Sequence, residues 1–540
     1  MTELKNFHGI ENTNFFEQDH KFQNLLEELL PTDLRGEVFD SLHECGARVA
    51  GRWNDLANIA NRKENEPRIV KFDRAGNAVE KIDFGLAVTT MRREVAEFGL
   101  FTRSKNLIHK FAQVYLLAHN GESSLTCPIS CTDGLIAALE AKGSQELKER
   151  YLPKILSSET PFAGAQFVTE HDAGSDVGAI KTLSVPPAVA GGSVSDAWQI
   201  TGDKWFCSNP DEFFVMATRV GEKEGTNGIG LFFVPRVIDA KVNNLSFLRL
   251  KDKLGTRALP TAEIRFENSI GFPIGDVNEG FKTLMNYVLN VSRIHNAVNA
   301  CGFLHRAILE AKNYTQQRNV FGQAIINFPL VQETLLRLES RLYLKLNLVF
   351  KLIALVDANG LVPEDEDQAM WQRFLTNLSK YRTAVQLTES IKEAILLFGG
   401  NGIVEDFTVL PRLLRDGMII ETWEGTHNTL AMQIMRDIKR SGLIDKFFEE
   451  LNFSLNNWRE NVPNEREKFV TVLKQAKERI TKEQMADDLW TAKNARRIVD
   501  CLGYLLETAW AAQRVGEDEN IPLISIACSE EFSSETLFKF

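Results

Sequence analysis

The stretch FKTLMNYVLNVSRIHNAVNACGFLHRAI, residues 281–308, predicts the architecture of the second half of the chain. Its apolar side chains recur every three or four residues over about eight turns, which places one apolar stripe on one face of a long helix. These side chains belong to Phe281, Leu284, Val288, Val291, Ile294, Val298, Cys301, Leu304 and Ile308. A stripe of this length needs other helices to cover it.

Three more long helices are expected with short connections between them. The second runs from Pro329 to Asn359, the third from about Asp367 to Phe398, and the fourth from near Glu424 to about Ser441. Four long helices joined by short links are typical of an antiparallel bundle. Residues 443–540 are expected to form further helices.

The segment before the bundle, residues 162–267, reads as strands instead. It contains short runs that are apolar and aromatic, or that alternate between apolar and polar residues, as strands do. The expected strands are 198–201, 213–218, 230–235 and 262–266. The segment 224–228 contains Asn-Gly, which tolerates positive φ, and predicts a hairpin turn. Residues 186–195 are expected to be a surface loop.

The first 161 residues are predicted to be helical, with no clear strand. A helix is expected over 38–56 with Thr32 or Asp33 as its cap, and another over 134–141 with Asp133 as its cap. The other expected helices are 88–98, 104–118 and 144–156. The predicted fold is therefore α+β, in four parts. They are an N-terminal helical domain (1–161), a small β-domain (162–275), a four-helix bundle (276–441) and a C-terminal helical extension (442–540).

The composition excludes several classes of protein. Hydrophobic residues make up 44% and charged residues 25% of the 540 residues, which is typical of a globular chain and argues against disorder. The 62 basic and 73 acidic residues give a net charge of −11, which argues against a general nucleic-acid binder. Seven cysteines, an odd and sparse number, indicate reduced thiols, and no apolar run is long enough to span a membrane. We therefore expect a cytoplasmic protein, and no metal site at Cys127 and Cys131, which lack a second pair of ligands.

Six short motifs carry residues suited to cofactor chemistry. They are Gln166–Asp176, Lys204–Asn209, Lys251–Arg257, Gln317–Gln323, Leu397–Ile403, and Arg415–Gly417 with Thr422–Asn428. Gly174 permits close backbone approach to a ligand, and Phe206 with Ser208 would share one face of a strand, where they could floor a flat ring. Arg318 suits a phosphate. Each motif alone is weak evidence. An ordinary turn explains the first better than a cofactor site does, a core aromatic residue explains the second better, and a charged turn or a helix end is the alternative for others.

Glu424 lies beside Trp423 and Gly425, just before an expected helix. A carboxylate in a dry, aromatic site has a raised pKa and can act as a general base. The alternative is a glutamate in the first turn of a helix.

Taken together and in this order, the motifs resemble those of the acyl-CoA dehydrogenase family of flavoproteins, from about Leu100 to Arg440. Within that family the chain is most similar to the AidB-like branch, which has a longer N-terminal part and a C-terminal helical extension. Trp423 and the segment Cys127–Ser130 also resemble that branch.

The resemblance implies an FAD enzyme of fatty-acid metabolism. Glu424 matches the family's base, which removes the α-proton of an acyl-CoA while the β-hydride passes to flavin N5, and Arg293 matches a catalytic arginine close to it. Positions matching the family's FAD-binding residues are Val168, Thr169, Gly174, Ser175, Phe206, Ser208, Arg318, Phe321, Gly399, Gly400, Asn401, Thr426 and Asn428. The implied partners are an acyl-CoA substrate, an electron-transfer flavoprotein as acceptor, and further copies of the chain in a homotetramer.

Some residues depart from the family pattern. Leu396 stands where the family has a glutamine, which puts one FAD contact between subunits in doubt, and His171-Asp172 replaces a smaller pair. His427 replaces a small residue; it could tune the pKa of the base or be an ordinary histidine on a helix surface.

Other functions stay open at this point. The AidB branch suggests a DNA-associated flavoprotein that protects DNA from alkylation, and a protein that sequesters acyl-CoA with little turnover is a further alternative. Residues 436–500 carry 14 basic and 12 acidic residues, a net +2, so the extension has no strong basic character. An oxidase that uses O₂ has the same motifs as a dehydrogenase.

Overall fold

The computed structural model describes residues 7, 9–10, 13–186, 197–458, 463–481, 485–514 and 520–530. The chain forms two compact units, and segments distant in sequence contribute to each. Unit 1 comprises Met1–Gly51, Asn106–Gly121 and Asn296–Phe540, and unit 2 comprises Arg52–Lys105 and Glu122–His295. The four domain boundaries expected from the sequence stay a prediction.

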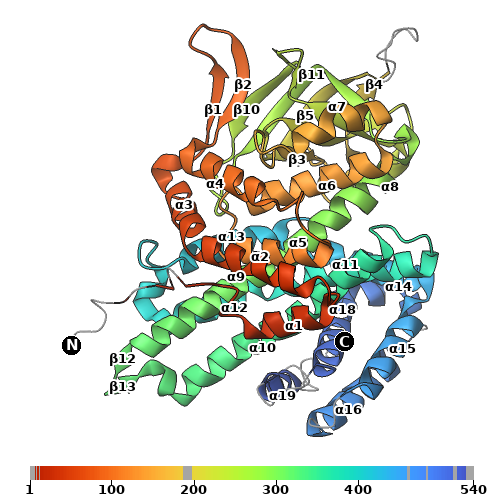
Figure 1. Cartoon of the computed structure of the whole chain (residues 1–540). Coiled ribbons are helices and arrows are strands. Elements are labelled where there is room, and N and C mark those ends of the chain that lie inside the picture. The colour runs from red at the N-terminus through yellow and green to blue at the C-terminus, as the bar shows by residue number, and fades with distance from the viewer. Residues whose placement is uncertain are drawn as a thin grey trace. The chain divides into compact units, whose positions relative to one another are not determined.

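A seven-stranded sheet forms the centre of unit 2 (Figure 1). Its strands are β3 (Gly164–Phe167), β4 (Leu183–Val185), β5 (Trp198–Ser208), β6 (Phe213–Val220), β7 (Ile229–Pro235), β10 (Leu245–Leu250) and β11 (Thr261–Pro273). The strand order is β10-β11-β5-β4-β6-β3, and β7 pairs with both β6 and β11, so the sheet curls on itself. Each strand expected from the sequence is present. A short hairpin follows β7, formed by β8 (Val237–Ile238) and β9 (Lys241–Val242).

Strand β6 is apolar along its length because both of its faces are covered. Phe213 and Val215 lie in one core cluster with residues of helices α6 (Thr126–Lys142) and α7 (Gln145–Ile155). Phe214, one step along the strand, lies in a second cluster with residues of β5, β10 and β11. Side chains of a strand alternate between its two faces, so the buried residues of β6 contribute alternately to the two core clusters.

The turn between β6 and β7 confirms the predicted hairpin, but Asn227 does not have the positive φ that the Asn-Gly pair suggested. The two strands pair antiparallel, and the positive φ values in their connection belong to Gly221 (+63°) and Gly225 (+64°) and not to Asn227. The expected loop at 186–195 lies outside the described residues except for Pro186.

Unit 2 differs from the sequence prediction in one helix and in one pair of strands. Its helices are α3 (Arg52–Ala60), α4 (Gly85–Phe98), α6, α7, α8 (Gly280–Thr283), a π-helical segment (Leu284–Leu289) and the first residues of α9 (Asn290–Gln317). The π-helical segment interrupts the expected regular helix. The prediction of no early strand is wrong, because β1 (Arg68–Phe72) and β2 (Ala78–Asp83) form a hairpin. Five side chains of β1 are exposed or half-buried, so it lacks the apolar signal of a core strand.

Two helix caps were also predicted wrongly. The helix expected over 38–56 breaks at Gly51 into α2 (Arg35–Ala50) and α3, and Leu34, which makes no side-chain capping bond, precedes α2 in place of Thr32 or Asp33. Asp133 lies in the interior of α6, where its carboxylate pairs with His295. Asp133 is therefore a buried partner of His295 and does not cap a helix.

Unit 1 is helical (Figure 1). Its helices are α1 (His20–Leu29), α2, α5 (Leu107–Ala118), the remainder of α9, α10 (Pro329–Asn359), α11 (Glu366–Val385), α12 (Leu387–Phe398), α13 (Leu410–Thr422), α14 (His427–Ser441), α15 (Leu443–Asn456), α16 (Pro463–Arg479), α18 (Asp488–Ala512) and α19 (Ile521–Glu530). The short strands β12 (Asn319–Val320) and β13 (Gln323–Ala324) form a hairpin between α9 and α10.

The bundle of unit 1 confirms the predicted fold class, with three corrections. Helix α10 has the predicted bounds, but the expected third helix breaks at Gln386 into α11 and α12. Helix α13 was not expected, and α14 begins at His427, so Glu424 lies in the turn before it.

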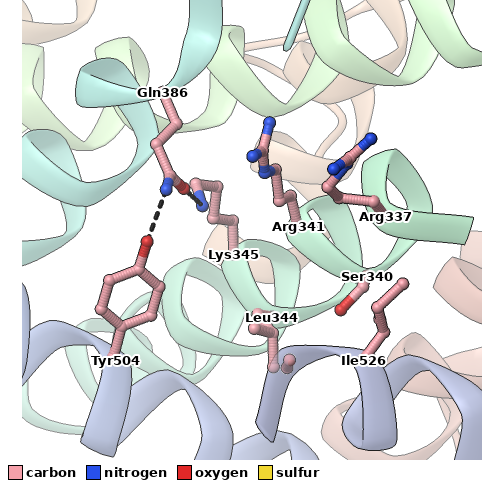
Figure 2. Close-up of a pocket in the computed structure, with 9 residues that line it drawn as sticks. Arg337, Ser340, Arg341, Leu344, Lys345, Gln386, Tyr504 and Ile526 are labelled. Carbon is pink, nitrogen blue, oxygen red and sulfur yellow. Dashed lines mark hydrogen bonds between the residues drawn. The ribbon is translucent and has the colours of Figure 1, made fainter. Parts of the chain in front are cut away.

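The break at Gln386 borders a small pocket in unit 1 (Figure 2). Lys345 of α10 donates to the Gln386 carbonyl at 2.9 Å, and the Gln386 amide donates to the hydroxyl of Tyr504 of α18. Arg337 and Arg341 add two more basic side chains from α10. The pocket contains none of the site residues expected from the sequence.

Candidate active site

The loop after β3 is tied to β5 in unit 2. Backbone N–H of Trp205 donates to the carbonyl of Thr169 at 2.9 Å, and the Lys204 ammonium donates to the carbonyl of Val168 at 3.2 Å. Thr169 and Val168 are both half-buried. These bonds give the two expected flavin-binding residues a fixed backbone position.

A buried ion pair between Lys204 and Glu170 also holds this loop. Lys204 donates to the Glu170 carboxylate at 2.7 Å, and Glu170 also accepts from the backbone N–H groups of Lys181 and Thr182. Burial alone would raise the pKa of Glu170, but Lys204 and these donors hold it below its ordinary value. Burial lowers the pKa of Lys204, while Glu170 opposes that shift. Both residues lie inside the quoted motifs, yet the sequence did not indicate that they pair.

Phe206 and Ser208 lie on β5, as expected. Phe206 is 51% exposed, although Cys207 beside it is fully buried. The Ser208 hydroxyl lies 3.1 Å from that of Thr261, and the Lys251 ammonium lies 4.7 Å from the centre of the Phe206 ring. An exposed aromatic ring on the same strand as a hydroxyl and near a cation fits a flat, electron-rich ligand.

Gly174 and Ser175 lie farther along the loop, and both are exposed. A Cβ built on Gly174 would meet nothing within 4 Å, so the packing of the protein does not require glycine there. The open space beside Gly174 is compatible with the other reason for a glycine, which is close approach of a ligand to the backbone.

Arg92 of α4 is a functional candidate that the sequence analysis missed. Its guanidinium donates to the Ser124 carbonyl at 2.8 Å and to the Asn209 side chain at 2.9 Å, with the Asp211 carboxylate at 3.7 Å. Asn209 follows Ser208 and has φ +53°, so Arg92 holds the end of β5 in place. Burial lowers the pKa of Arg92 and raises the pKa of Asp211 to about 6.

Arg293 lies in the first turn of α9, which begins where the π-helical segment ends, and it is 3% exposed. Two residues on, the His295 imidazole lies 2.7 Å from the carboxylate of Asp133. The hydroxyl of Ser292 bonds to the amide of Gln166 at 2.8 Å. Insertions of π-helix are frequent at functional sites, and here one precedes three polar residues within four positions, Ser292, Arg293 and His295.

Glu424 lies in unit 1, in the turn between α13 and α14. It is half-buried, and its backbone is left-handed with φ +55°, followed by Gly425 with φ +107°. A left-handed backbone is unfavourable for a residue with a Cβ and persists only where surrounding contacts hold it. The interpretation of Glu424 as a first-turn helix residue is therefore wrong.

Thr426 and Asn428 follow this turn, and both are exposed. The Thr426 hydroxyl lies 3.1 Å from that of Thr429. His427 is half-buried, and burial, with the charges of Lys380 and Arg496, lowers its pKa to about 4. It is therefore neutral at pH 7 and is not a freely solvated histidine.

Arg318 and Phe321 lie at the end of α9 and in the β12–β13 turn. Arg318 is half-buried, whereas Phe321 is 97% exposed with φ +51°. An aromatic side chain this exposed has no cover from the described part of its own chain.

The glycine loop follows α12 at Gly399–Ile403. Gly399 has φ +61°, and neither Gly399 nor Gly400 would place a Cβ within 4 Å of another atom. Asn401 donates to the hydroxyl of Tyr314 at 3.3 Å, four residues before Arg318 on α9. This bond ties the glycine loop to the last turns of α9, just before the motif Gln317–Gln323. Leu396, the departure from the family glutamine, is 69% exposed.

Among the described residues, no cluster of three or more histidine, cysteine, aspartate or glutamate side chains could hold a metal. Cys127 and Cys131 are both buried on α6, with 3.8 Å between their sulfur atoms. No described helix is both long and apolar enough to cross a membrane.

Family models match most of the chain. The N-terminal domain of the adaptive response protein AidB matches residues 7–160, the acyl-CoA dehydrogenase middle domain matches 165–269, and the acyl-CoA dehydrogenase C-terminal domain matches 278–439. Together these three segments cover the helical, strand-rich and bundle regions in the predicted order.

Individual relatives agree with these matches. Acyl-CoA dehydrogenase family member 11 from Caenorhabditis elegans is 30% identical over 444 residues, which are 78% of this chain and 70% of that protein. Putative acyl-CoA dehydrogenase AidB from Escherichia coli is 28% identical over 416 residues, 73% of each protein.

Solved structures show the same fold. The crystal structure of Caenorhabditis elegans ACDH-11 in complex with C11-CoA is 25% identical, with a TM-score of 0.88 over 99% of this chain and 94% of that chain. A Bacillus anthracis acyl-CoA dehydrogenase complexed with FAD is 18% identical, with a TM-score of 0.67 over 84% of this chain and 81% of that one. The chain therefore belongs to the acyl-CoA dehydrogenase family of FAD-binding proteins and carries an AidB-type N-terminal domain.

Proposed function

We propose that this protein is an FAD-dependent acyl-CoA dehydrogenase that introduces an α,β double bond into an acyl-CoA thioester. The observation that carries the proposal is the position of Glu424, a half-buried carboxylate on a left-handed turn at the place of the family's base. The carboxylate of a general base must point toward the proton that it removes. A turn anchored between two helices can hold the carboxylate in one such direction. Arg293 is the second residue that we propose for catalysis.

The residues present suit FAD. In unit 2, the exposed ring of Phe206, the hydroxyl of Ser208 and the open space at Gly174 fit one face of a flat ring. In unit 1, Arg318 offers a guanidinium for a phosphate, as the family resemblance implies. The other residues that we propose for FAD binding are Val168, Thr169, Ser175, Phe321, Gly399, Gly400, Asn401, Thr426 and Asn428.

The chemistry divides between cofactor and protein. FAD, when bound, supplies the acceptor for the substrate β-hydride. Glu424 takes the α-proton onto a carboxylate oxygen, which removes the second hydrogen of the new double bond. The proton and the hydride together account for the two hydrogens lost by the substrate.

The ligand seen in a relative supports the substrate class. ACDH-11 was crystallised with C11-CoA, and its likeness to this chain extends over nearly the whole length of both. We propose an acyl-CoA substrate on this basis, together with an electron-transfer flavoprotein as acceptor, a homotetrameric assembly and a cytoplasmic location, as the family resemblance and the reduced cysteines suggest.

The test is an anaerobic titration of the purified yellow protein with acyl-CoAs of increasing chain length, followed by the visible flavin spectrum. The expected result is bleaching, strongest at the preferred chain length. Glu424→Gln should keep the bound FAD but lose flavin reduction, whereas Glu405→Gln, at a 60% exposed glutamate paired with Arg415, should bleach normally. Normal bleaching of Glu424→Gln would remove Glu424 from its proposed role.

A protein that stays yellow with every acyl-CoA would favour sequestration or DNA association. In the described structure, two basic residues of the segment 436–500 that could contribute to a DNA-binding patch have partners within the chain. Lys439 lies 2.6 Å from the Asp488 carboxylate, and Arg497 donates to Asn494 at 3.3 Å. A salt-dependent DNA-binding assay would decide between the two remaining functions.

A further inference from the structure

Lys380 of α11 is completely buried, and its ammonium lies against the turn that carries Glu424. The ammonium donates to the carbonyl of Gly425 at 2.7 Å and to the carbonyl of Glu421 at 3.2 Å. A lysine without access to water needs acceptors such as these, because an unsatisfied buried charge is very costly. Both acceptors belong to the backbone of one short segment.

The two carbonyls lie on either side of Glu424. Glu421 belongs to the last turn of α13, whose carbonyls have no partner within the helix, and a cation at that end also complements the helix dipole. Gly425 follows Glu424 directly. One side chain therefore spans the residue that we propose as the base.

Neighbouring elements hold the start of the same segment. Asn296 of α9 donates to the carbonyl of Ile420 at 3.3 Å, and the hydroxyl and backbone N–H of Thr388 donate to the Glu421 carboxylate. These contacts stop before Glu424. The hydrogen bond from Lys380 to the carbonyl of Gly425 adds a contact on the C-terminal side of Glu424.

We propose that Lys380 is a positioning residue that holds Glu424 in its left-handed conformation and so sets the direction of its carboxylate. This inference rests on the proposed function for the role of Glu424 as base. The ammonium replaces the backbone contacts that a regular helix would provide, since the chain leaves the helical path at Trp423 and rejoins it at His427. Without the tether, the backbone at Glu424 can relax to a conformation with negative φ.

The pKa of His427 provides an independent measure of the positive charge at Lys380. The groups that face it are Lys380, Arg496, the ring of Tyr381 at 5.9 Å and the Glu421 carboxylate at 4.0 Å. Burial is the largest cause of its lowered pKa, and the positive charges of Lys380 and Arg496 contribute further.

The experiment compares Lys380→Met with Lys345→Met in the holoenzyme. Lys345 is a matched control because it is 2% exposed and lies in the same unit, but its ammonium donates to the side-chain oxygen of Gln386 at 2.9 Å. Hydrogen exchange measured by mass spectrometry should show faster exchange over residues 419–430 in Lys380→Met, by about 10- to 100-fold, as expected for loss of a hydrogen bond from a charged donor. Lys345→Met should leave that segment as in the wild type.

Two further readouts separate positioning from general stability. In Lys380→Met, the pKa of His427 followed by NMR should rise from about 4, and FAD should stay bound while its reduction by acyl-CoA slows by about 10- to 100-fold. If Lys380→Met does not fold, Lys380→Gln keeps a neutral donor and should show smaller changes in the same direction.

The outcomes distinguish this inference from the proposed function. If the wild type is not reduced by any acyl-CoA, the proposed function fails, but hydrogen exchange still tests whether Lys380 holds the turn. If Lys380→Met exchanges over 419–430 at the wild-type rate, or reduces its flavin at the wild-type rate, the positioning role of Lys380 is wrong.

Discussion

Replacing Arg382 with methionine tests what attaches the C-terminal helix α18 to the bundle helix α11 within unit 1. The Arg382 guanidinium meets the Glu507 carboxylate through two contacts, Nε–Oε1 at 3.0 Å and Nη2–Oε2 at 3.3 Å. Its Nη1 donates to Asp500 at 3.0 Å, and the guanidinium lies 3.8 Å from the centre of the Tyr504 ring. The Arg382 side chain is 1% exposed and that of Glu507 is 0% exposed, whereas Asp500 is 34% exposed.

The size of the effect follows from this burial. Burial alone would lower the pKa of Arg382, but Glu507, Tyr504 and Asp500 raise it well above its usual value, so the guanidinium stays charged. Arg382→Met leaves the Glu507 carboxylate buried without its cation, and breaking one partner of a buried pair costs about 3–5 kcal/mol. Replacing both partners with apolar residues of similar volume is often close to neutral, so Arg382→Met with Glu507→Met should lose only about 1 kcal/mol or less.

The assay is native-state hydrogen exchange over α18, because a chain with two compact units does not guarantee one global unfolding transition. The opening free energy of 488–512 should fall in Arg382→Met and largely return in the double variant.

Two results would refute this reasoning. A loss below about 1 kcal/mol in Arg382→Met would mean that the buried pair contributes little to the attachment. A double variant as unstable as the sum of the two single variants would mean that Arg382 and Glu507 act independently.

Two further predictions concern the candidate site. Arg318→Ala should weaken FAD retention, because the guanidinium is the proposed partner of a phosphate; equal flavin content after gel filtration would contradict this assignment. His427 has a folded pKa of about 4 against an ordinary 6.5, so the unfolded chain binds more protons between these values, and the contribution of His427 to stability is lost as pH falls from about 6.5 to 4. His427→Phe should reduce that acid loss in urea unfolding measured across this range, whereas identical pH slopes in both proteins would show that His427 does not titrate as described.

Local signals explain which elements could be predicted. Helix α10 carries Pro329 at its start and Gly360 just after its end, and both signals act within a few residues of the backbone that they shape. Strands β6 and β7 were predicted from short apolar runs, because a strand covered on both faces is apolar throughout.

The missed features are a hairpin with a largely exposed first strand and two breaks in long helices. Strands β1 and β2 pair with each other in a local hairpin, and every side chain of β1 is exposed or half-buried, so β1 lacks the pattern of a core strand. The breaks at Gln386 and Gly51 divide helices whose apolar period continues across them. A period of three or four residues shows which face is buried, but not where a helix bends to reach its neighbour.

The sequence by itself determined the order of helical and strand-rich regions and the residue types of the site, because hydrophobic period, turn residues and motif spacing are local properties. Only the tertiary structure decided that Glu424 lies on a left-handed turn, that Lys380 holds this turn, and that Glu170 pairs with Lys204. The physical reason is burial: a polar group removed from water must find a partner, and the partner is whichever group the folded chain brings near it, often from far along the sequence.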